Sequence, residues 1–516
     1  MSREPLLAAF DDLLARRPTA PLVIASGHCA TVADVDALAR AAAAALAAGA
    51  GTGVGAGAGS APRPGEAVAL QAANGPAFLA ALVALRRAGC AVLLLDRRTP
   101  ELERHRVGAE VGARFALLAV DPWNAACDPA GFRLEALGGP GHVPTASRPL
   151  PAGTAVVKLT SGSTGAARGI AATMESLVAD DEALRAAMGI GTDDRLLAAV
   201  PFSHSYGLSS LVMPALTAGL PLVLPADKAP FCPIAAAAEA EATVLPTVPA
   251  YLGALCRLAD PPPLPASLRL VLTAGAPLGA ETSTRFRQRF GLAVHVFYGA
   301  SEVGGICYDR EGGAAERGAV GTPVGGVRLE LAAVGDDGTD LLQGDTGDGG
   351  RLIVRSPAAA LGYLPATAAT AGRLAGGRFV TDDLAVWRGG ELALVGRLND
   401  LINVKGKKVN PREVETVLAA LPAVEEAMVF GSPVSHPGGA DRDPVVRAVI
   451  ACRPGSLTTA EVVAHCRRRL ADHKVPRSVV LVDELPRNDR GKLDRRAAGA
   501  LAVGGDAAAS SPLPAG

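Results

Sequence analysis

Leu159-Thr160-Ser161-Gly162-Ser163-Thr164-Gly165-Ala166-Ala167-Arg168-Gly169 is the stretch that decides the fold. Its first two residues end a run at 155–160 that is typical of a buried strand, and a helical pattern follows at 171–187. Glycines let backbone N–H groups approach an anion, hydroxyls donate hydrogen bonds, and Arg168 supplies positive charge. The stretch therefore predicts a polyphosphate-binding loop. It lacks the Walker pattern, and a flexible Ser/Gly linker is the alternative interpretation.

Short apolar runs alternate with helical patterns on both sides of this loop. We expect strands at 155–160, 195–200, 220–224, 269–274 and 293–297, and helices at 78–88, 101–111, 171–187 and 280–290. Alternation of this kind favours parallel sheets with crossover helices. The predicted fold class is therefore α/β, with a large N-terminal domain of doubly wound parallel sheets.

The pattern changes after about residue 320, where Gly, Asp and Thr cluster in tight turns. Short strands expected at 351–355, 379–380 and 391–395 indicate a β-rich subdomain. Strands at 401–404, 427–430 and 445–451 and helices at 411–420 and 459–470 indicate a small α+β domain. We expect a large domain at 1–397, a small mobile C-terminal domain at 398–500 and a disordered tail at 501–516.

Composition narrows the class of protein. The 516 residues call for more than one domain, and 49% of them are hydrophobic, which excludes a chain disordered throughout. Fifty Lys and Arg against 51 Asp and Glu exclude binding of nucleic acid or membrane through net charge. No secretory signal, membrane span or C-x-x-C pair is apparent, so we expect a cytoplasmic protein with reduced thiols.

Three further motifs could carry chemistry, although each is weak by itself. In Tyr298-Gly299-Ala300-Ser301-Glu302, the ring could stack on a base and the carboxylate could hold Mg²⁺ with substrate phosphates. Asp382-Asp383, followed by Gly396-Arg397, could bind a ribose and a phosphate. Arg487-Asn488-Asp489-Arg490-Gly491-Lys492 is a basic turn, which alone would be interpreted as a surface loop.

Taken together and in this order, the four motifs resemble the adenylate-forming superfamily of acyl- and aryl-CoA synthetases, nonribosomal adenylation domains and luciferases. The resemblance covers residues 20 to 498. It implies that a carboxylate attacks the α-phosphate of ATP, giving acyl-AMP and pyrophosphate, and that a thiol, usually that of coenzyme A, then displaces AMP. ATP and Mg²⁺ would be the cofactors, and coenzyme A the co-substrate.

The resemblance also assigns residues to the nucleotide. The loop Thr160, Ser161, Gly162, Ser163, Thr164 and Gly165, with Arg168, would hold the β- and γ-phosphates. The adenine would be framed by Gly275, Ala276, Pro277, Tyr298, Gly299, Ala300 and Ser301. Thr164 and Glu302 match the Mg²⁺ positions, Asp383 the ribose-binding acid and Arg397 the basic contact beside it.

The C-terminal part matches the family's moving domain. Lys492 matches the lysine that bridges the substrate carboxylate and the α-phosphate. This role is physically reasonable, because a mobile positive charge reduces the repulsion between two anions that must react. Asn399 falls at the hinge position, and Lys405-Gly406 matches the loop that helps to bind coenzyme A in the second step. The chain has only seven lysines, and five of them follow residue 400.

Three positions depart from the family pattern. Arg168 replaces the usual lysine but keeps the charge. Asp382 replaces a glycine and adds an acid beside Asp383, and Asn399 replaces the more common Asp or Lys. These departures leave open a non-catalytic, nucleotide-binding homologue.

The segment Pro201-Phe202-Ser203-His204-Ser205-Tyr206-Gly207 bears on the acid. It lacks the Asp that amino-acid-activating relatives use, which disfavours a free α-amino acid. His204 matches a residue near the reacting carboxylate, although a lone His is often structural. The expected acyl pocket consists of His204, Tyr206, Ser209, Ser210, Ala274, Gly275, Val296, Gly304 and Gly305. These residues are mostly small or apolar, and none is Lys, Arg, Asp or Glu, which favours a neutral fatty or aryl tail in a deep pocket.

The sequence therefore predicts an ATP-dependent carboxylate–CoA ligase whose partners are a small carboxylic acid, ATP and coenzyme A. An acyl-AMP ligase that loads the phosphopantetheine thiol of a carrier protein is the alternative. The non-catalytic nucleotide-binding protein is the third hypothesis. Nucleic acid is not an expected partner.

Overall fold

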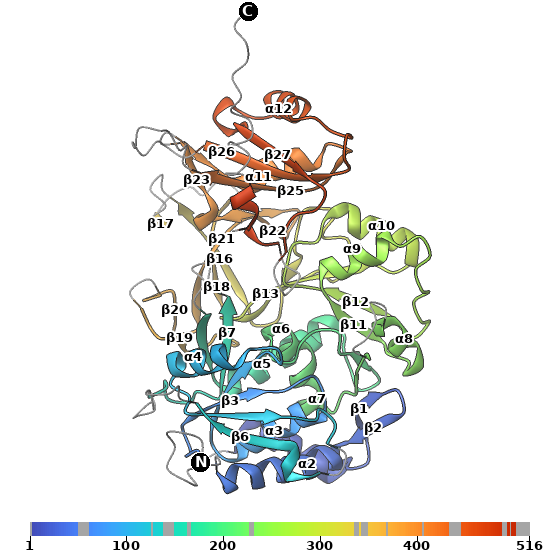
Figure 1. Ribbon diagram of the computed structural model, residues 1–516, viewed down its shortest axis with the longest axis vertical. Helices are drawn as coiled ribbons and strands as arrows, with labels where there is room; N and C mark the ends of the chain where they lie inside the picture. Colours follow the sequence, from blue (N-terminus) through green and yellow to red (C-terminus); the bar gives the residue numbers. More distant parts are fainter. Residues whose placement is uncertain are drawn as a thin grey trace, which may run out of the picture. The chain divides into compact units, whose positions relative to one another are not determined.

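The computed structural model describes residues 3–49, 61–124, 127–137, 149–161, 167–226, 232–334, 340–341, 349–367, 370–404, 407–432, 445–487, 493–495 and 497–501. The chain divides into two compact units (Figure 1). The first unit contains residues 1–329 and 353–380, and the second contains 330–352 and the chain from 381 onward. The predicted domain boundary after Arg397 stays a prediction, because compactness does not tell which part of a chain moves.

The first unit contains a seven-stranded sheet that carries the predicted phosphate loop. Its strand order is β19-β8-β7-β4-β3-β5-β6. Four central strands are parallel, and β6, β8 and β19 are antiparallel to their neighbours. The strands are β3 (Ala67–Gln71), β4 (Ala91–Leu95), β5 (Phe115–Ala119), β6 (Phe132–Ala136), β7 (Val156–Ser161), β8 (Ala167–Ala172) and β19 (Gly362–Leu364). Helices α2 (Val32–Ala48), α3 (Pro76–Arg87) and α4 (Glu101–Val111) belong to the same segment of chain.

A nine-stranded sheet carries the predicted adenine and acyl residues. Its parallel core runs β13-β12-β11-β9-β10-β1, and β2, β14 and β15 are antiparallel at its edges. The strands are β1 (Pro21–Ala25), β2 (His28–Thr31), β9 (Leu196–Leu197), β10 (Leu222–Val223), β11 (Val244–Thr247), β12 (Leu270–Thr273), β13 (Val294–Ala300), β14 (Gly304–Tyr308) and β15 (Thr322–Pro323).

Helices gather beside this sheet and close one hydrophobic core. Figure 1 shows α8 (Cys232–Glu239), α9 (Pro249–Arg257) and α10 (Ala280–Phe290) near β11, β12 and β13. Phe286 of α10, Leu255 of α9 and Leu245 of β11 are fully buried in this core. Because apolar strands end at one edge of the sheet, the polar residues that follow them lie together there.

A further group of helices contains α1 (Pro5–Arg16), α5 (Met174–Met188), α6 (Ser205–Gly207), the π-helix η2 (Leu208–Val212) and α7 (Met213–Ala218). The helix predicted at 171–187 begins only at Met174, because the Thr173 side chain accepts a hydrogen bond from the backbone N–H of Ser176 and caps it. Residues 167–172 form strand β8 instead. The predicted phosphate loop therefore joins two antiparallel strands, and the expectation that it runs directly into a helix was wrong.

The remaining elements are mainly β-structure. A six-stranded sheet has the order β17-β16-β18-β21-β20, with β22 beside β21. Its strands are β16 (Arg328–Val334), β17 (Asp340–Leu341), β18 (Gly349–Arg355), β20 (Leu374–Ala375), β21 (Arg378–Arg388) and β22 (Glu391–Arg397). The C-terminal part adds the pair β23 (Ile402–Val404) and β24 (Lys407–Val409), the sheet of β25 (Val424–Ser432), β26 (Val445–Cys452) and β27 (Ser478–Val482), and helices α11 (Pro411–Ala419) and α12 (Thr459–Arg467). Three short 3₁₀ turns are η1 (Pro129–Gly131), η3 (Leu398–Asp400) and η4 (Asp472–Lys474).

The predicted α/β class, with parallel sheets and a separate C-terminal unit, is confirmed. In the part of the chain that the structure describes, every helix is too short or too polar to cross a bilayer.

Candidate active site

The strands that flank the predicted phosphate loop place Thr160 and Arg168 opposite each other on β7 and β8. Directly opposed residues of an antiparallel pair project from the same face, so this hydroxyl and this guanidinium stand side by side below the loop. Both side chains are half-buried. Gly162, Ser163, Thr164 and Gly165 lie outside the described residues, as does the side chain of Ser161.

The predicted adenine residues follow the carboxyl ends of two neighbouring parallel strands. Thr273 of β12 is in register with Val296 of β13, and two residues further on come Gly275 and Tyr298. Gly275 has φ +83°, a left-handed conformation that favours glycine. Gly275, Ala276 and Pro277 are exposed, and the Tyr298 ring is half-buried. An exposed turn beside an aromatic ring at such an edge suits a flat heterocycle.

Glu302 lies in the turn between β13 and β14, after Gly299, Ala300 and Ser301. Its Oε1 accepts a hydrogen bond from the hydroxyl of Tyr363 at 2.9 Å, and its backbone carbonyl accepts one from the N–H of Ala360 at 2.8 Å. Ser205 donates to the hydroxyl of Ser301 at 2.7 Å, which joins helix α6 to the same turn. The turn is therefore fixed from two directions, and the carboxylate of Glu302 has a defined orientation.

His204 and Tyr206 begin the helical segment that contains α6, η2 and α7. The Nδ1 atom of His204 accepts a hydrogen bond from the backbone N–H of Tyr206 at 3.3 Å, so the neutral ring carries its proton on Nε2. Tyr206 is buried, its ring centroid lies 5.8 Å from that of Phe297, and burial raises its pKa. Its hydroxyl lies 3.4 Å from the carbonyl oxygen of Leu272, so the segment reaches the end of β12.

Asp180 is a buried acid that sequence reasoning missed. One of its oxygens accepts a hydrogen bond from the hydroxyl of Ser209 at 2.6 Å, and the other accepts one from the backbone N–H of Gly305 at 2.7 Å. Burial raises the pKa of Asp180, and these hydrogen bonds and the charge of Lys158 act in the opposite direction. An available signal was its spacing, because 180 falls in the apolar stripe formed by 177, 184 and 188 on one helix face.

The packing of Asp180 and its helix shows that the inference of a deep acyl pocket was not justified. A Cβ atom on Gly304 would lie 2.3 Å from Oδ1 of Asp180, and one on Gly305 would lie 2.6 Å from Cδ2 of Leu184. These two positions are small because side chains of α5 pack against them. The small size of these residues is therefore no evidence of a deep acyl pocket. None of the expected pocket residues is itself acidic, but the carboxylate of Asp180 accepts hydrogen bonds from two of them, Ser209 and Gly305.

Lys158 is a second buried charge. It is 3% exposed on β7, and Lys158, Ile170 and Tyr363 form one registered row across β7, β8 and β19. Residues in such a row share a face, so Lys158 projects from the same face as Tyr363, which holds Glu302. Burial lowers the pKa of Lys158, while the carboxylates of Asp180 and Glu302 raise it. The ammonium group thus interacts with both carboxylates.

The second unit contains the predicted ribose residues. Asp383 of β21 is in register with Arg397 of β22, and Nε of Arg397 donates to Oδ1 of Asp383 at 2.8 Å. Asp382 instead approaches Arg351, with 3.4 Å between the carboxylate and the guanidinium group. Alternation along the strand directs the two acids to opposite faces, so the departure at 382 does not place a second carboxylate beside Asp383.

For four other predicted site residues, the structure does not describe the side chain. The backbone of Asn399 lies in the turn η3, but its side chain is outside the described part. Lys405, Gly406 and Lys492 also lie outside the described residues. Their assignments stay predictions.

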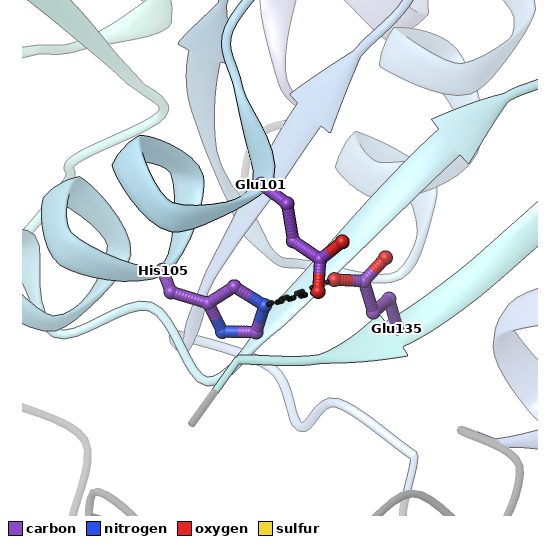
Figure 2. A group of neighbouring side chains, drawn as sticks. All are labelled: Glu101, His105 and Glu135. Carbon is purple, nitrogen blue, oxygen red and sulfur yellow. Dashed lines mark ion pairs between the residues drawn. The ribbon is translucent and has the colours of Figure 1, made fainter. Parts of the chain in front are cut away.

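A group of possible metal ligands occurs elsewhere in the first unit. Glu101 and His105 of α4 and Glu135 of β6 bring three ligand atoms within 4.8 Å of one another (Figure 2). Arg104, however, donates to both oxygens of Glu135 at 3.0 and 3.1 Å, and Arg133 lies 3.6 Å from the same carboxylate. Glu135 is already paired with two cations, so we interpret the group as an ion-pair network.

Comparison with known proteins gives consistent results along the chain. Residues 10–364 match the model of the AMP-binding enzyme family, and residues 413–492 match that of the AMP-binding enzyme C-terminal domain. A feruloyl-CoA synthase from Amycolatopsis sp is 32% identical over 447 residues, covering 84% of this chain and 88% of that protein. A 3-[(3aS,4S,7aS)-7a-methyl-1,5-dioxo-octahydro-1H-inden-4-yl]propanoyl:CoA ligase from Mycobacterium tuberculosis is 29% identical over the same shares of the two chains. Among solved structures, ATP-bound MatB from Rhodopseudomonas palustris superimposes with a TM-score of 0.79 at 25% identity, covering 96% of this chain and 98% of that one.

Proposed function

The chain belongs to the family of AMP-binding enzymes, and on this premise we propose that it is an ATP-dependent carboxylate–CoA ligase. It activates a carboxylic acid as acyl-AMP with release of pyrophosphate, and then transfers the acyl group to the thiol of coenzyme A. The observation that carries this proposal is the 32% identity, over 84% of the chain, to a protein named as a CoA synthase. The match of both family models in the expected order supports it.

The described residues of the first unit support particular roles in the first step. Thr160 and Arg168, which project together below the loop, bind the β- and γ-phosphates. Gly275, Ala276, Pro277 and Tyr298 hold the adenine at the edge of the sheet. These groups fix the α-phosphate in position, so that attack by the carboxylate is favoured by proximity rather than by new covalent chemistry.

Glu302 fits a magnesium site. A carboxylate is a ligand of the kind that Mg²⁺ prefers, and the hydrogen bond from Tyr363 gives it one orientation. When bound, the ion would neutralise negative charge on the phosphates. Thr164, the second predicted ligand, lies outside the described residues.

The residues expected around the acyl group support an uncharged fatty or aryl acid. Tyr206, Val296 and Ala274 present mainly apolar atoms, and the two buried charges nearby, Asp180 and Lys158, offset each other. In this proposal His204, with its proton on Nε2, donates a hydrogen bond to the reacting carboxylate or to the acyl phosphate, and the hydrogen bond that Nδ1 accepts from the N–H of Tyr206 supports that proton position.

A carrier-protein thiol is the second candidate acceptor. The predicted coenzyme A loop Lys405-Gly406 continues into Lys407-Lys408 and is therefore basic, and Lys407, which begins β24, is exposed. A basic segment of this kind would suit either the phosphates of coenzyme A or an acidic carrier protein. Parallel assays with coenzyme A and with a phosphopantetheinylated carrier protein separate the two acceptors by their kcat/KM values.

The test of adenylation is carboxylate-dependent exchange of pyrophosphate into ATP, measured with a broad panel of fatty and aryl acids. We expect exchange with at least one acid in the absence of any thiol. Lack of exchange with every acid, in protein shown to bind ATP, would favour the non-catalytic homologue and contradict the ligase.

A further inference from the structure

Lys158 on β7 and Asp180 on α5 are a buried base and a buried acid that have no role in the proposed first step. Each residue is only 3% exposed. Charged side chains are rarely buried to this degree without an opposite charge nearby, because burial removes the water that stabilises the charge. Each of the two residues therefore needs a partner in the interior.

Asp180 lies among the expected acyl-pocket residues. Its two oxygens accept hydrogen bonds from the hydroxyl of Ser209 at 2.6 Å and from the backbone N–H of Gly305 at 2.7 Å. A Cβ atom on Gly305 would lie 3.1 Å from Cε2 of Phe297, and the ring centroid of Phe297 lies 5.8 Å from that of Tyr206. The carboxylate is thus on the same side of the nine-stranded sheet as the ring of Tyr206.

Lys158 projects toward this region from the seven-stranded sheet. Its neighbour Val157 points to the opposite face, where it packs in a core with Val107 of α4. Lys158 shares a registered row with Tyr363, whose hydroxyl donates to Glu302 at 2.9 Å. Glu302 stands in the turn before β14, the strand that Asp180 contacts. Lys158 and Asp180 therefore reach the beginning of β14 from two different elements.

The charge of Lys158 acts on two carboxylates. Burial lowers the pKa of Lys158, while the charges of Asp180 and, to a smaller extent, Glu302 raise it. Burial raises the pKa of Asp180, while its two hydrogen bonds and the charge of Lys158 lower it. Since the proposed function assigns the charge of Glu302 to Mg²⁺, Asp180 is the carboxylate that is left to balance Lys158.

The next acid along α5 has a separate partner. Asp181 is fully buried, lies 2.9 Å from the guanidinium group of Arg185 and accepts a hydrogen bond from the hydroxyl of Thr217 at 2.6 Å. Neither Arg185 nor Thr217 is an expected pocket residue. Of the two neighbouring acids, Asp180 is thus the one whose charge adjoins the expected acyl site.

We propose that Lys158 and Asp180 form a charge pair that determines the class of acid: the pair is neutral as a whole, so the enzyme selects acids whose tail carries no charge. Without Lys158, the carboxylate would attract an ammonium group on the tail, and without Asp180 the ammonium group of Lys158 would attract a second carboxylate. The inference rests on the proposed ligase function. It assigns the preference for an uncharged tail to two particular residues.

The test compares acids that differ only in the group at the end of the tail. Heptanoate, heptanedioate and 6-aminohexanoate end in a methyl group, a carboxylate and an ammonium group. The aryl set is para-ethylcinnamate, para-carboxycinnamate and para-(aminomethyl)cinnamate. We would measure kcat/KM by pyrophosphate release, and we expect the wild-type enzyme to prefer the uncharged acid of a set over each charged one by about tenfold or more.

Two single variants should change this preference in opposite directions. In Lys158→Met, kcat/KM for the ammonium acid should rise relative to that for the uncharged acid by about tenfold or more, because Asp180 is left unbalanced. In Asp180→Asn, the relative kcat/KM for the acid with a second carboxylate should rise by a similar factor. The double variant Lys158→Met/Asp180→Asn has no unbalanced charge and should return to the wild-type preference. Because ratios within one set are compared, a general loss of activity does not affect the result.

Asp181→Asn and Arg185→Met are the matched controls. They remove the charges of a second pair on the same helix, in which the acid is buried as deeply as Asp180. Both substitutions should lower the midpoint of thermal unfolding, because each leaves one partner without its opposite charge. Neither should change the ratios among the three acids of a set.

The outcomes separate this inference from the proposed function. If no acid is activated, the ligase function itself fails. If acids are activated but the wild-type enzyme prefers a charged one, or if both single variants keep the wild-type ratios, the charge pair is contradicted and the ligase function stands. If a single variant does not fold, the double variant decides, since it should fold once no charge is left unbalanced. A double variant that is no more stable than the less stable single variant would overturn the pairing.

Discussion

The hydroxyl of Tyr363 on β19 donates a hydrogen bond to Oε1 of Glu302, in the turn after β13, over 2.9 Å. This bond links the seven-stranded sheet, which carries the predicted phosphate loop, to the nine-stranded sheet, which carries the predicted adenine and acyl residues. It also fixes the carboxylate that we assign to magnesium. Sequence reasoning identified Glu302 but not Tyr363, because the two residues are brought together only by tertiary structure.

Tyr363→Phe should therefore weaken the use of magnesium and ATP while preserving the fold. Phenylalanine keeps the ring but leaves the carboxylate without its donor, and a hydrogen bond to a charged group contributes about 1.5–3 kcal/mol. We expect the KM for MgATP to rise by about tenfold or more in assays of pyrophosphate release. Tyr251→Phe is the control, because the hydroxyl of Tyr251 is buried without a partner among the described residues. An unchanged KM for MgATP in Tyr363→Phe would contradict the role given to Glu302.

Lys492→Ala should nearly abolish formation of the acyl-adenylate but spare the second half-reaction. The resemblance assigns this lysine to the first step only, in which it bridges the substrate carboxylate and the α-phosphate. A mobile positive charge is most useful where these two anions approach each other. We would measure pyrophosphate exchange for the first step and conversion of added acyl-AMP to acyl-CoA for the second. Lys474→Ala is a suitable control, because Lys474 is engaged in an ion pair with Glu413 at 2.7 Å. Equal loss of both half-reactions would refute the assignment.

Arg168→Lys should retain most of the activity, whereas Arg168→Met should not. The guanidinium group stands beside Thr160 at the base of the loop, where its charge matters more than its two-pronged shape. The measurement is kcat/KM for ATP in both variants. A loss beyond about a hundredfold in Arg168→Lys, about 2.7 kcal/mol of transition-state stabilisation, would show that the shape of the group is required.

Asp194→Asn should reduce stability at neutral pH and have little effect in acid. Burial raises the pKa of Asp194, but hydrogen bonds from Arg269, Thr243 and Gly191 outweigh burial and lower it overall. Because the folded pKa lies below the unfolded value of about 3.9, the stabilisation is complete above about pH 4 and is lost as the pH falls through the folded pKa.

Denaturation at a series of pH values measures this effect. We expect the variant to be less stable by about 1–3 kcal/mol at pH 7 and the difference to shrink below pH 4. Asp193→Asn, which changes the exposed neighbour, should alter stability little at any pH. A difference that stays constant from pH 7 to pH 3.5 would mean that Asp194 acts through packing rather than charge.

The sequence predicted helices best where strong end signals flank them. The expected spans 101–111 and 280–290 agree with α4 and α10 at both ends. Their C-terminal ends could be predicted because a glycine in the left-handed conformation, Gly112 or Gly291, terminates each helix. Strand β8 was missed because its alanine-rich sequence favours a helix, and pairing with β7 outweighs that local preference.

The candidate site shows the same division between local and long-range information. Motifs with a fixed spacing, such as Tyr298 to Glu302, could be recognised along the chain. The burial of Asp180 could be inferred from the apolar stripe of its helix, but its hydrogen bonds to Ser209 and Gly305 could not, because those residues are distant from it in sequence. The reason for a glycine at 304 also depends on Asp180. A glycine can line an open pocket or make room for a close neighbour, and at Gly304 the structure shows the close neighbour.

The most direct test of the ligase function is to incubate the enzyme with ATP, Mg²⁺, coenzyme A and each acid of the panel, and to measure acyl-CoA and AMP by mass spectrometry. A carboxylate–CoA ligase should form the two products in equal amounts, with one pyrophosphate released per acyl-CoA. Formation of ADP instead of AMP, or the absence of acyl-CoA with every acid that supports pyrophosphate exchange, would contradict an AMP-forming carboxylate–CoA ligase.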